Sequence, residues 1–365
     1  MTHSIKTQGH GEQGRTMINS GFWGKLKKPF FCLAPMSDVT DIAFRYILAK
    51  YSKNRKNKDR IVFWTEFVAA DGLCNKLAKK KLSHILKFSN SEKPIVAQIF
   101  GANPKNMKEA CQYIASLGFD GIDINMGCPD KSVVSQGAGV GLIKTPQLAR
   151  KIIEAVHAGI KSAGQNIPVS VKTRVGFNKE EIDTWIPELL KEDISALTIH
   201  LRTSKEMSLV PANWIYIKKI KELIKKSGKD ILLIGNGDIK SIKDGEEKAL
   251  EYGCDGVMIG RGVFGNPFFF AKKNVLSEVE GLVPLDSTRG EMYVPSISEK
   301  LKVLIEHARI FDKELSKPKY KSFAVMKKHF KAYVNGFNGA KELRVKLMEA
   351  KNASQVKKII ENFLK

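Results

Sequence analysis

The chain has 365 residues, 43% of them hydrophobic, which is enough for one large domain and a smaller one but not for three independent cores. Its five cysteines are widely scattered, with no C-x-x-C pair and no histidine cluster at zinc spacing, so neither a disulfide framework nor a metal site is indicated. No apolar run reaches the roughly 18 residues of a membrane span and no signal-peptide pattern is present, so we expect a cytoplasmic protein.

The charge is positive and concentrated at one end of the chain. Lys and Arg number 61 against 38 Asp and Glu, a formal net charge of +23. Residues 296–365 hold 17 Lys and Arg against 7 Asp and Glu, and this net +10 lies in about a fifth of the chain. A high pI can be a general habit of a proteome, but this distribution predicts a polyanionic partner, because neutralising phosphates releases their counterions.

Residues 1–20 are polar and glycine-rich without an apolar period, and we expect a mobile tail there. Eight short β-rich segments follow, each ended by Gly, Pro, Asn or Asp and then by a longer segment of helical spacing. The predicted strands are Phe30–Met36, Ile61–Glu66, Ile95–Phe100, Gly121–Asn125, Val169–Arg174, Leu197–His200, Ile231–Asn236 and Gly256–Ile259. Continuous apolar runs suit strands that are buried on both faces, with helices as parallel crossovers. The pattern predicts an α/β fold, a (β/α)8 TIM barrel, over residues 21–280.

The pattern changes beyond the eighth predicted strand. Residues 281–295 contain Gly281, Pro284, Gly290 and Pro295 among residues of mixed polarity, which is typical of a linker. In residues 296–365 apolar side chains recur at helical spacing without strand signals. We therefore expect a small all-helical C-terminal domain.

Cys128 stands where the fourth predicted strand breaks into a glycine-rich loop, in the sequence Ile-Asn-Met-Gly-Cys-Pro-Asp at 124–130. Catalytic groups of an α/β barrel lie at the C-terminal ends of its strands, so a thiol at this point is presented to a ligand. The alternative is a small apolar filler, which most cysteines are.

Glycine turns follow the seventh and eighth predicted strands, at Asn236–Asp238 and Gly260–Gly262. Barrels of this kind bind a phosphate there through backbone N–H groups and a guanidinium, which Arg261 would supply. Either turn alone is more often an ordinary turn. Their placement on consecutive strand ends predicts a phosphate-bearing cofactor.

Two polar side chains on neighbouring predicted strands also indicate a ligand. Lys172 follows Val-Ser-Val in its strand, and a buried ammonium needs a partner. That partner is either a carboxylate, Glu66 or Asp123, or a flavin, whose reduced anionic form an ammonium near N1 and C2 stabilises. His200 is either a core histidine bonded to a backbone carbonyl or a donor to cofactor or substrate.

The motifs also occur in an informative order. They are Ala-Pro-Met at 34–36 with Val-Thr-Asp at 39–41, Thr-Glu-Phe-Val at 65–68, Gln-Ile-Phe-Gly at 98–101, residues 123–129 with Gly-Ala-Gly at 137–139, Val-Lys-Thr-Arg at 171–174, Ile-His at 199–200, and the two glycine turns. In this order they resemble the tRNA-dihydrouridine synthase family over residues 30–270. Met-Lys-Lys-His at 326–329 with Tyr333, Gly336 and Leu-Arg at 343–344 resembles that family's helical RNA-binding domain.

The resemblance implies FMN as cofactor, NADPH as electron donor, and reduction of the C5=C6 bond of specific uridines in tRNA. Cys128 would protonate C5, since a thiol with a pKa of about 8.5 is mostly protonated at neutral pH. Carried over by position, the flavin contacts are Pro35, Met36, Ser37, Gln98, Lys172, His200, Asn236, Gly237, Asp238, Gly260 and Arg261. The implied substrate and RNA contacts are Asn125, Arg174, Arg202, Lys327, Lys328 and Arg344. We expect a monomer that binds tRNA and neither DNA nor a membrane.

Positive charge should surround the barrel mouth, because a uridine in folded tRNA must leave its stack to reach a flavin there. Lys76, Lys79, Lys80 and Lys81 follow the second predicted strand and so belong to the active-site face. The basic run 50–60 precedes that strand and belongs to the opposite face, where it is either a phosphate contact or a solvated loop.

The sequence departs from the family pattern in three places. Leu201 replaces the glycine that usually follows the histidine, the usual Tyr-Gly pair is missing from 204–210, and Ser37-Asp38 stands where a small residue and a glycine are common. These changes concern substrate loops more than the cofactor core. Two alternatives therefore stay open: an FMN-dependent reductase of a free pyrimidine, related to dihydroorotate dehydrogenases, and a catalytically silent RNA-binding protein.

Overall fold

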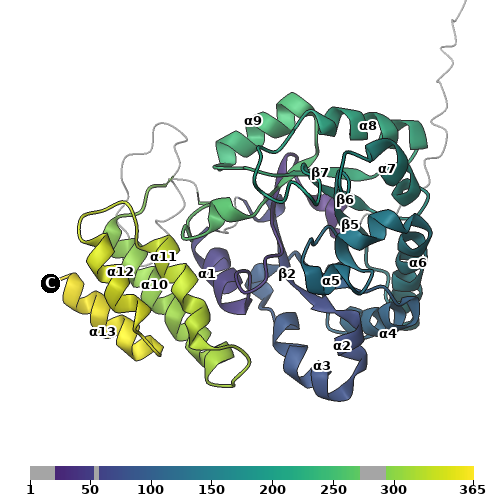
Figure 1. Ribbon diagram of the computed structural model, residues 1–365. Helices are drawn as coiled ribbons and strands as arrows, with labels where there is room; N and C mark the ends of the chain where they lie inside the picture. Colours follow the sequence, from purple (N-terminus) through teal and green to yellow (C-terminus); the bar gives the residue numbers. More distant parts are fainter. Residues whose placement is uncertain (1–20, 53–56, 272–292) are drawn as a thin grey trace, which may run out of the picture.

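The computed structural model describes residues 21–52, 57–271 and 293–365. Eight parallel strands pair in chain order, and β8 closes the barrel on β1 (Figure 1). They are β1 Phe30–Leu33, β2 Ile61–Ala69, β3 Ile95–Phe100, β4 Gly121–Met126, β5 Val169–Arg174, β6 Ala196–His200, β7 Leu232–Asn236 and β8 Gly256–Ile259. The predicted TIM barrel is confirmed.

Alternation along each strand decides which side chains enter the barrel. Phe30 and Cys32 of β1 belong to an inner apolar cluster with Trp64, whereas Phe31 and Leu33 pack outward against the helices. Trp23, from a 3-10 helix at Gly21–Lys25, packs on Phe30 and Trp64 and fills the barrel at the start of its strands. The opposite end, where polar residues replace this packing, is the end available for a site.

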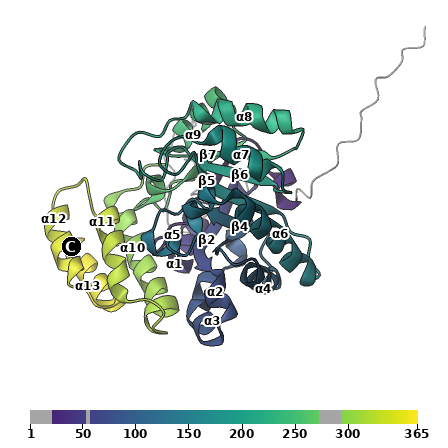
Figure 2. The same cartoon turned by 45° about the vertical axis from the view of Figure 1, so that its right-hand side comes forward.

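Helices surround the barrel and cover the outward faces of its strands (Figures 1 and 2). They are α1 Ile42–Ser52, α2 Ala70–Cys74, α3 Lys76–Leu82, α4 Pro104–Ala115, α5 Lys131–Val134, α6 Pro146–Ser162, α7 Ile182–Leu190, α8 Tyr216–Ser227 and α9 Ile242–Tyr252. Among the described residues, none of the helices combines the length and apolarity needed to cross a bilayer.

The ends of two strands differ from the prediction by three residues, and one boundary each of β4, β6 and β7 differs by one residue. β1 ends at Leu33 instead of Met36, because the backbone N–H of Met36 donates to Thr40 Oγ1 at 2.9 Å in a turn and leaves the sheet. β2 runs to Ala69 instead of Glu66, and its pairing with β3 shifts register between Trp64 and Phe67. This irregularity breaks the apolar alternation that sequence patterns use to end a strand.

The C-terminal region is helical, as predicted, with α10 Ile297–Phe311, α11 Met326–Tyr333, α12 Ala340–Met348 and α13 Ala353–Phe363. Its apolar core includes Ala43 and Ile47 of α1, so the region packs against the barrel through that helix (Figures 1 and 2). The predicted tail 1–20, residues 281–292 of the predicted linker and residues 53–56 of the basic run lie outside the described residues. The domain boundaries stay predictions.

Candidate functional site

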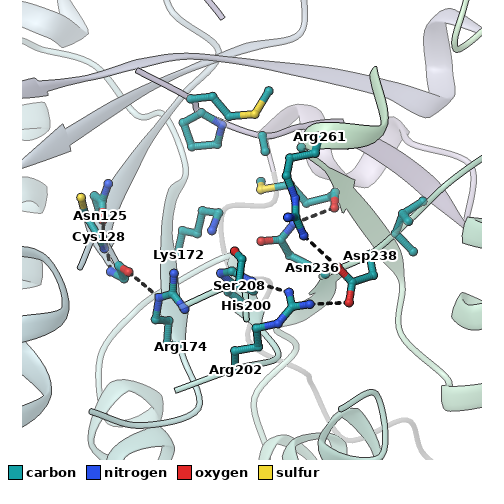
Figure 3. A pocket seen from close by; sticks show the side chains of 18 of the residues that line it. Asn125, Cys128, Lys172, Arg174, His200, Arg202, Ser208, Asn236, Asp238 and Arg261 are labelled. Carbon is teal, nitrogen blue, oxygen red and sulfur yellow. Dashed lines mark hydrogen bonds and ion pairs between the residues drawn. The ribbon is translucent and has the colours of Figure 1, made fainter. Parts of the chain in front are cut away.

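A cavity of about 640 Å³ opens at the C-terminal ends of the strands (Figure 3). All eight strands, or the turns directly after them, contribute to its wall. The predicted residues in the wall are Pro35, Met36, Gln98, Asn125, Cys128, Lys172, Arg174, His200, Arg202, Asn236, Gly237, Asp238, Gly260 and Arg261. Ser37 is exposed and is not in the wall. Sequence reasoning missed Phe67, Ser208 and Met258, which also line the cavity.

A chain of hydrogen bonds connects the barrel core to the Cys128 loop. Asp123 accepts from Ser170 Oγ at 2.6 Å and from Gln98 Nε2 at 2.7 Å, and Gln98 Oε1 accepts from Asn125 Nδ2 at 3.0 Å. Asn125 Oδ1 then accepts the backbone N–H groups of Gly127 and Cys128 at 3.1 and 2.9 Å. Asn125 therefore fixes the loop that carries the thiol, and one N–H of its amide is left for a ligand.

Cys128 is held from the other side as well. Arg174 Nε donates to Gly127 O at 2.8 Å (Figure 3), and Val140 N donates to Cys128 O at 3.1 Å. Burial raises the pKa of the half-buried Cys128 thiol, and the nearby cations of Arg174 and Lys172 only partly oppose this. The thiol is therefore kept protonated at neutral pH, as the predicted acid requires.

Lys172 enters the cavity from β5 and, within the described part of the chain, forms no ion pair. Both carboxylates considered as its partners are otherwise engaged, since Glu66 pairs with Lys321 at 2.7 Å and Asp123 takes the bonds given above. Desolvation, with the Arg174 cation, lowers the pKa of Lys172 to about 8, although Asp123 acts in the opposite direction. The ammonium is therefore available to a ligand in the cavity.

His200 ends β6 beside Arg202, whose Nη1 lies 3.1 Å from His200 Nε2. Desolvation strongly lowers the pKa of His200, and the surrounding Arg and Lys cations lower it further. The ring is therefore neutral. If Nε2 accepts from Arg202, the ring proton lies on Nδ1, and this N–H can donate to a ligand.

Asp238 joins the turns after β6, β7 and β8. It accepts from Arg202 Nη2, from Ala212 N at 2.9 Å and from Arg261 Nη2 at 3.0 Å (Figure 3), at a positive φ of 52°. The Arg202 hydrogen bond is the largest influence that lowers the pKa of Asp238. The side chain of Arg202 is 3% exposed and that of Arg261 is 67% exposed, so of these two only Arg261 remains open to an incoming phosphate.

Replacing Asp238 by alanine should destabilise the protein by about 2 kcal/mol, because it leaves the buried Arg202 cation without its carboxylate. Urea unfolding checks this, with Arg261→Ala as control, for which a loss below about 1 kcal/mol is expected at an exposed pair. Since the pKa of Asp238 is lowered, its contribution is present at neutral pH and is lost as the pH falls through the folded-state pKa. Equal losses in the two variants would contradict this role.

Leu201, which stands where the family pattern has glycine, does not line the cavity. Its side chain is fully buried in the apolar layer outside the barrel, and its backbone N–H donates to Asn236 O at 3.0 Å. A bulky residue is therefore accommodated without approaching the ligand. The loop 204–210, which lacks the Tyr-Gly pair, does reach the cavity. It contributes only the small Ser208 to the cavity wall (Figure 3).

The predicted RNA contacts fall into two groups. Arg174 and Arg202 are buried, and they donate to backbone carbonyls, Arg174 to Thr203 at 3.0 Å and Arg202 to Val210 at 2.6 Å. In the helical region, Lys327 is exposed, Lys328 is half-buried, and Arg344 Nη1 donates to Val334 O at 2.6 Å. Of these side chains, Lys327 is the most accessible to RNA.

The fold and the cavity define a (β/α)8-barrel enzyme whose site suits a phosphate-bearing cofactor beside a protonated thiol. Residues 32–365 match the family model for dihydrouridine synthase, so the chain belongs to that family. It is 39% identical over 347 residues to the "Probable tRNA-dihydrouridine synthase" of Staphylococcus aureus strain COL, with 95% of this chain and 96% of that protein covered. It is also 39% identical to the "Probable tRNA-dihydrouridine synthase 2" of Bacillus subtilis strain 168, with 95% and 97% covered.

The chain also resembles solved structures. Histamine dehydrogenase from Rhizobium sp. 4-9 matches with a TM-score of 0.45 and 13% identity, covering 66% of this chain and 44% of that chain. Family membership confirms the predicted activity, the formation of dihydrouridine in tRNA by a flavin-dependent oxidoreductase. The family also implies a flavin cofactor and tRNA as substrate.

Proposed function

We propose that FMN binds in the cavity, that NADPH is the electron donor, and that Cys128 protonates C5 of the uracil. The observation that carries this proposal is the joint presence, in one cavity, of a protonated thiol, a lysine that has no ion pair with any described residue, and an exposed arginine at a glycine turn. In the overall reaction the C5=C6 bond gains two hydrogens while one NADPH is oxidised and one proton is consumed.

The residues of the wall fit FMN. Gly237 has a φ of +146°, and a Cβ there would come within 2.5 Å of Ala212 Cβ, so only glycine suits this turn. Gly237, Gly260 and Arg261 would hold the phosphate with backbone N–H groups and a guanidinium. Lys172 and the Nδ1–H of neutral His200 would face the isoalloxazine. When bound, FMN supplies the hydride that is added to C6.

Cys128 and Asn125 would act on the uracil. The free N–H of the Asn125 amide can donate to an acceptor on the base, and the Cys128 thiol can donate its proton to C5 from the face opposite the flavin. Because Asn125 and Arg174 hold the backbone of the loop, the thiol does not need to reorganise when the base arrives. Cys128 is thus a general acid, not a nucleophile.

Exposed positive charge supports the RNA side of the proposal, although none of the four lysines of α3 lines the cavity. α3 follows β2 and holds Lys76, Lys80 and Lys81 with exposed side chains, and Lys79 lies over the Tyr113 ring at 3.3 Å. The helical region adds the net charge of +10 found in the sequence. Such charge would hold tRNA by its phosphates while the target uridine leaves its stack.

The test is to mix the flavin-loaded protein with NADPH and tRNA that lacks dihydrouridine, and to measure dihydrouridine by nucleoside mass spectrometry. We expect dihydrouridine in tRNA and none from free uridine, with slower turnover when NADH replaces NADPH. An enzyme that reduces a free pyrimidine and leaves tRNA intact would instead be the small-molecule reductase. A protein that binds tRNA but no flavin would be the silent RNA-binding alternative.

A further inference from the structure

We propose that Asp38 and Lys321 form an interdomain lock, which sets the position of the helical region, and of tRNA held on it, relative to Cys128. This inference rests on the proposed function, in which the helical region binds tRNA. Both are positioning residues, since neither lines the cavity.

The lock is an ionic contact between the two parts of the chain, in which the Lys321 side chain is buried and that of Asp38 is 47% exposed. Lys321 precedes α11, and its Nζ lies 2.9 Å from Asp38 Oδ1 and 2.7 Å from Glu66 Oε1. Asp38 N also donates to Glu66 Oε1, at 2.5 Å. The Lys321 side chain is 9% exposed and that of Glu66 is 4% exposed. One ammonium therefore holds together the turn after β1, the bulged end of β2 and the segment before α11.

The contact of Lys321 with Glu66 is unlike an ordinary surface salt bridge, because both of these side chains are buried. If Lys321 moved away, Glu66 would remain buried without its cation, which is strongly unfavourable. Lys328 of α11 adds a second, longer contact, 3.9 Å from Asp38 Oδ2. With two carboxylates around its ammonium, Lys321 is not available to a phosphate. Its role is therefore to join the two parts of the chain, whereas the exposed Lys327 on α11 is free to meet RNA.

The backbone conformation at Asp38 supports a role for the aspartate side chain. Its φ is +56°, a conformation that favours glycine. An aspartate here carries backbone strain that a glycine would avoid. The contacts of its carboxylate with Lys321 and Lys328 give a physical reason for the aspartate.

The lock also adjoins the cavity. Pro35 and Met36, two of the predicted flavin contacts, lie in the same turn as Asp38, and Met36 O accepts from Thr40 N at 3.0 Å across that turn. On the other side, Phe67 follows Glu66 directly and lines the cavity. A displacement of Lys321 would therefore affect two parts of the cavity wall. Met36 is two residues from Asp38, and Phe67 is the residue after Glu66.

The test compares Asp38→Gly, Lys321→Met and Lys321→Arg in the flavin-loaded full chain. Asp38→Gly suits the backbone, so we expect a melting temperature at or above that of the wild type and an unchanged flavin Kd. We expect kcat for tRNA to fall at least tenfold in Asp38→Gly and Lys321→Met, with dihydrouridine appearing at additional tRNA positions. Lys321→Arg, which can still bridge both carboxylates, should restore most of kcat.

Lys161→Met, at an exposed site on α6, is the matched control for loss of a surface cation. It should leave kcat and the modified positions as in the wild type. Wild-type kcat and positions in Asp38→Gly would overturn the lock.

Hydrogen exchange separates the lock from the proposed function. Loss of the lock should speed amide exchange in residues 35–40 and in α11 in Asp38→Gly, and this measurement does not depend on turnover. If the wild type forms no dihydrouridine, the proposed function fails while the exchange result still decides the lock. Unchanged exchange in both segments would refute it.

Discussion

Replacing Cys128 by alanine is expected to slow dihydrouridine formation by about 10²–10⁴-fold, the usual contribution of a positioned general acid. The thiol is the proton donor in our proposal, and the bonds from Asn125 and Arg174 that fix its loop go to backbone atoms, so they survive the substitution. Flavin binding and flavin reduction by NADPH should stay close to wild type. Single-turnover assays that follow flavin reduction and dihydrouridine separately would measure both rates.

Cys74→Ala is the matched control. Cys74 is also half-buried, but its Sγ donates to Asn106 O at 3.4 Å on the outer surface of the barrel, and it does not line the cavity. This variant should retain wild-type turnover. Similar losses in the two variants would indicate a structural effect of removing a thiol and would remove the case for Cys128 as the acid.

The pH dependence distinguishes an acid from a nucleophile. Burial raises the pKa of Cys128, so the protonated, active form persists at neutral pH and is lost only as the pH rises through that raised pKa. The rate of uracil protonation should therefore be flat through neutral pH and fall on the alkaline side. A thiolate nucleophile would give the opposite trend, a rate that increases with pH.

The barrel could be predicted because each of its strands is marked by residues that are close together in the sequence. Each strand is a short apolar run ended by a turn residue, and the two larger boundary errors arise where the neighbouring sequence does not decide the end of the strand. At β1 the apolar Ala34, Pro35 and Met36 continue the pattern, but Thr40 ends the strand through its hydroxyl. At β2 the register shift after Trp64 conceals three further residues of the strand.

The composition of the site was predictable for a related reason, since the ends of parallel strands meet on one face. The partners of its side chains were not. Lys321 reaches Glu66 across 255 positions of sequence, and no periodic pattern records such a contact. Likewise, nothing local indicates that Arg174 and Arg202 are used to hold loops, so both were expected to face RNA. Solvent access follows from packing, which a single sequence does not contain.

Lys172→Met is expected to lower the rate of flavin reduction by about 10²-fold, since in our proposal Lys172 is the cation that would stabilise the negative charge gained by the cofactor. The same change should stabilise the flavin-free protein. Desolvation lowers the pKa of Lys172 to about 8, which means that the fold opposes the charged form and bears a penalty at neutral pH. Removing the ammonium relieves that penalty, by about 1–3 kcal/mol in the free energy of unfolding.

The sign of the pH effect follows from proton counting. Between about pH 8 and the ordinary lysine value of 10.5 the unfolded chain binds more protons at this position than the folded protein does, so wild-type stability should rise with pH across that window. Lys172→Met should lose this slope, whereas Lys161→Met, at an exposed site on α6, should keep it. Denaturant unfolding at pH 7, 8, 9 and 10 would measure the slope directly. If Lys172→Met is both less active and less stable than the wild type, Lys172 stabilises the fold. If the variant is less active but more stable, the wild-type protein gives up stability to keep a charge for the cofactor.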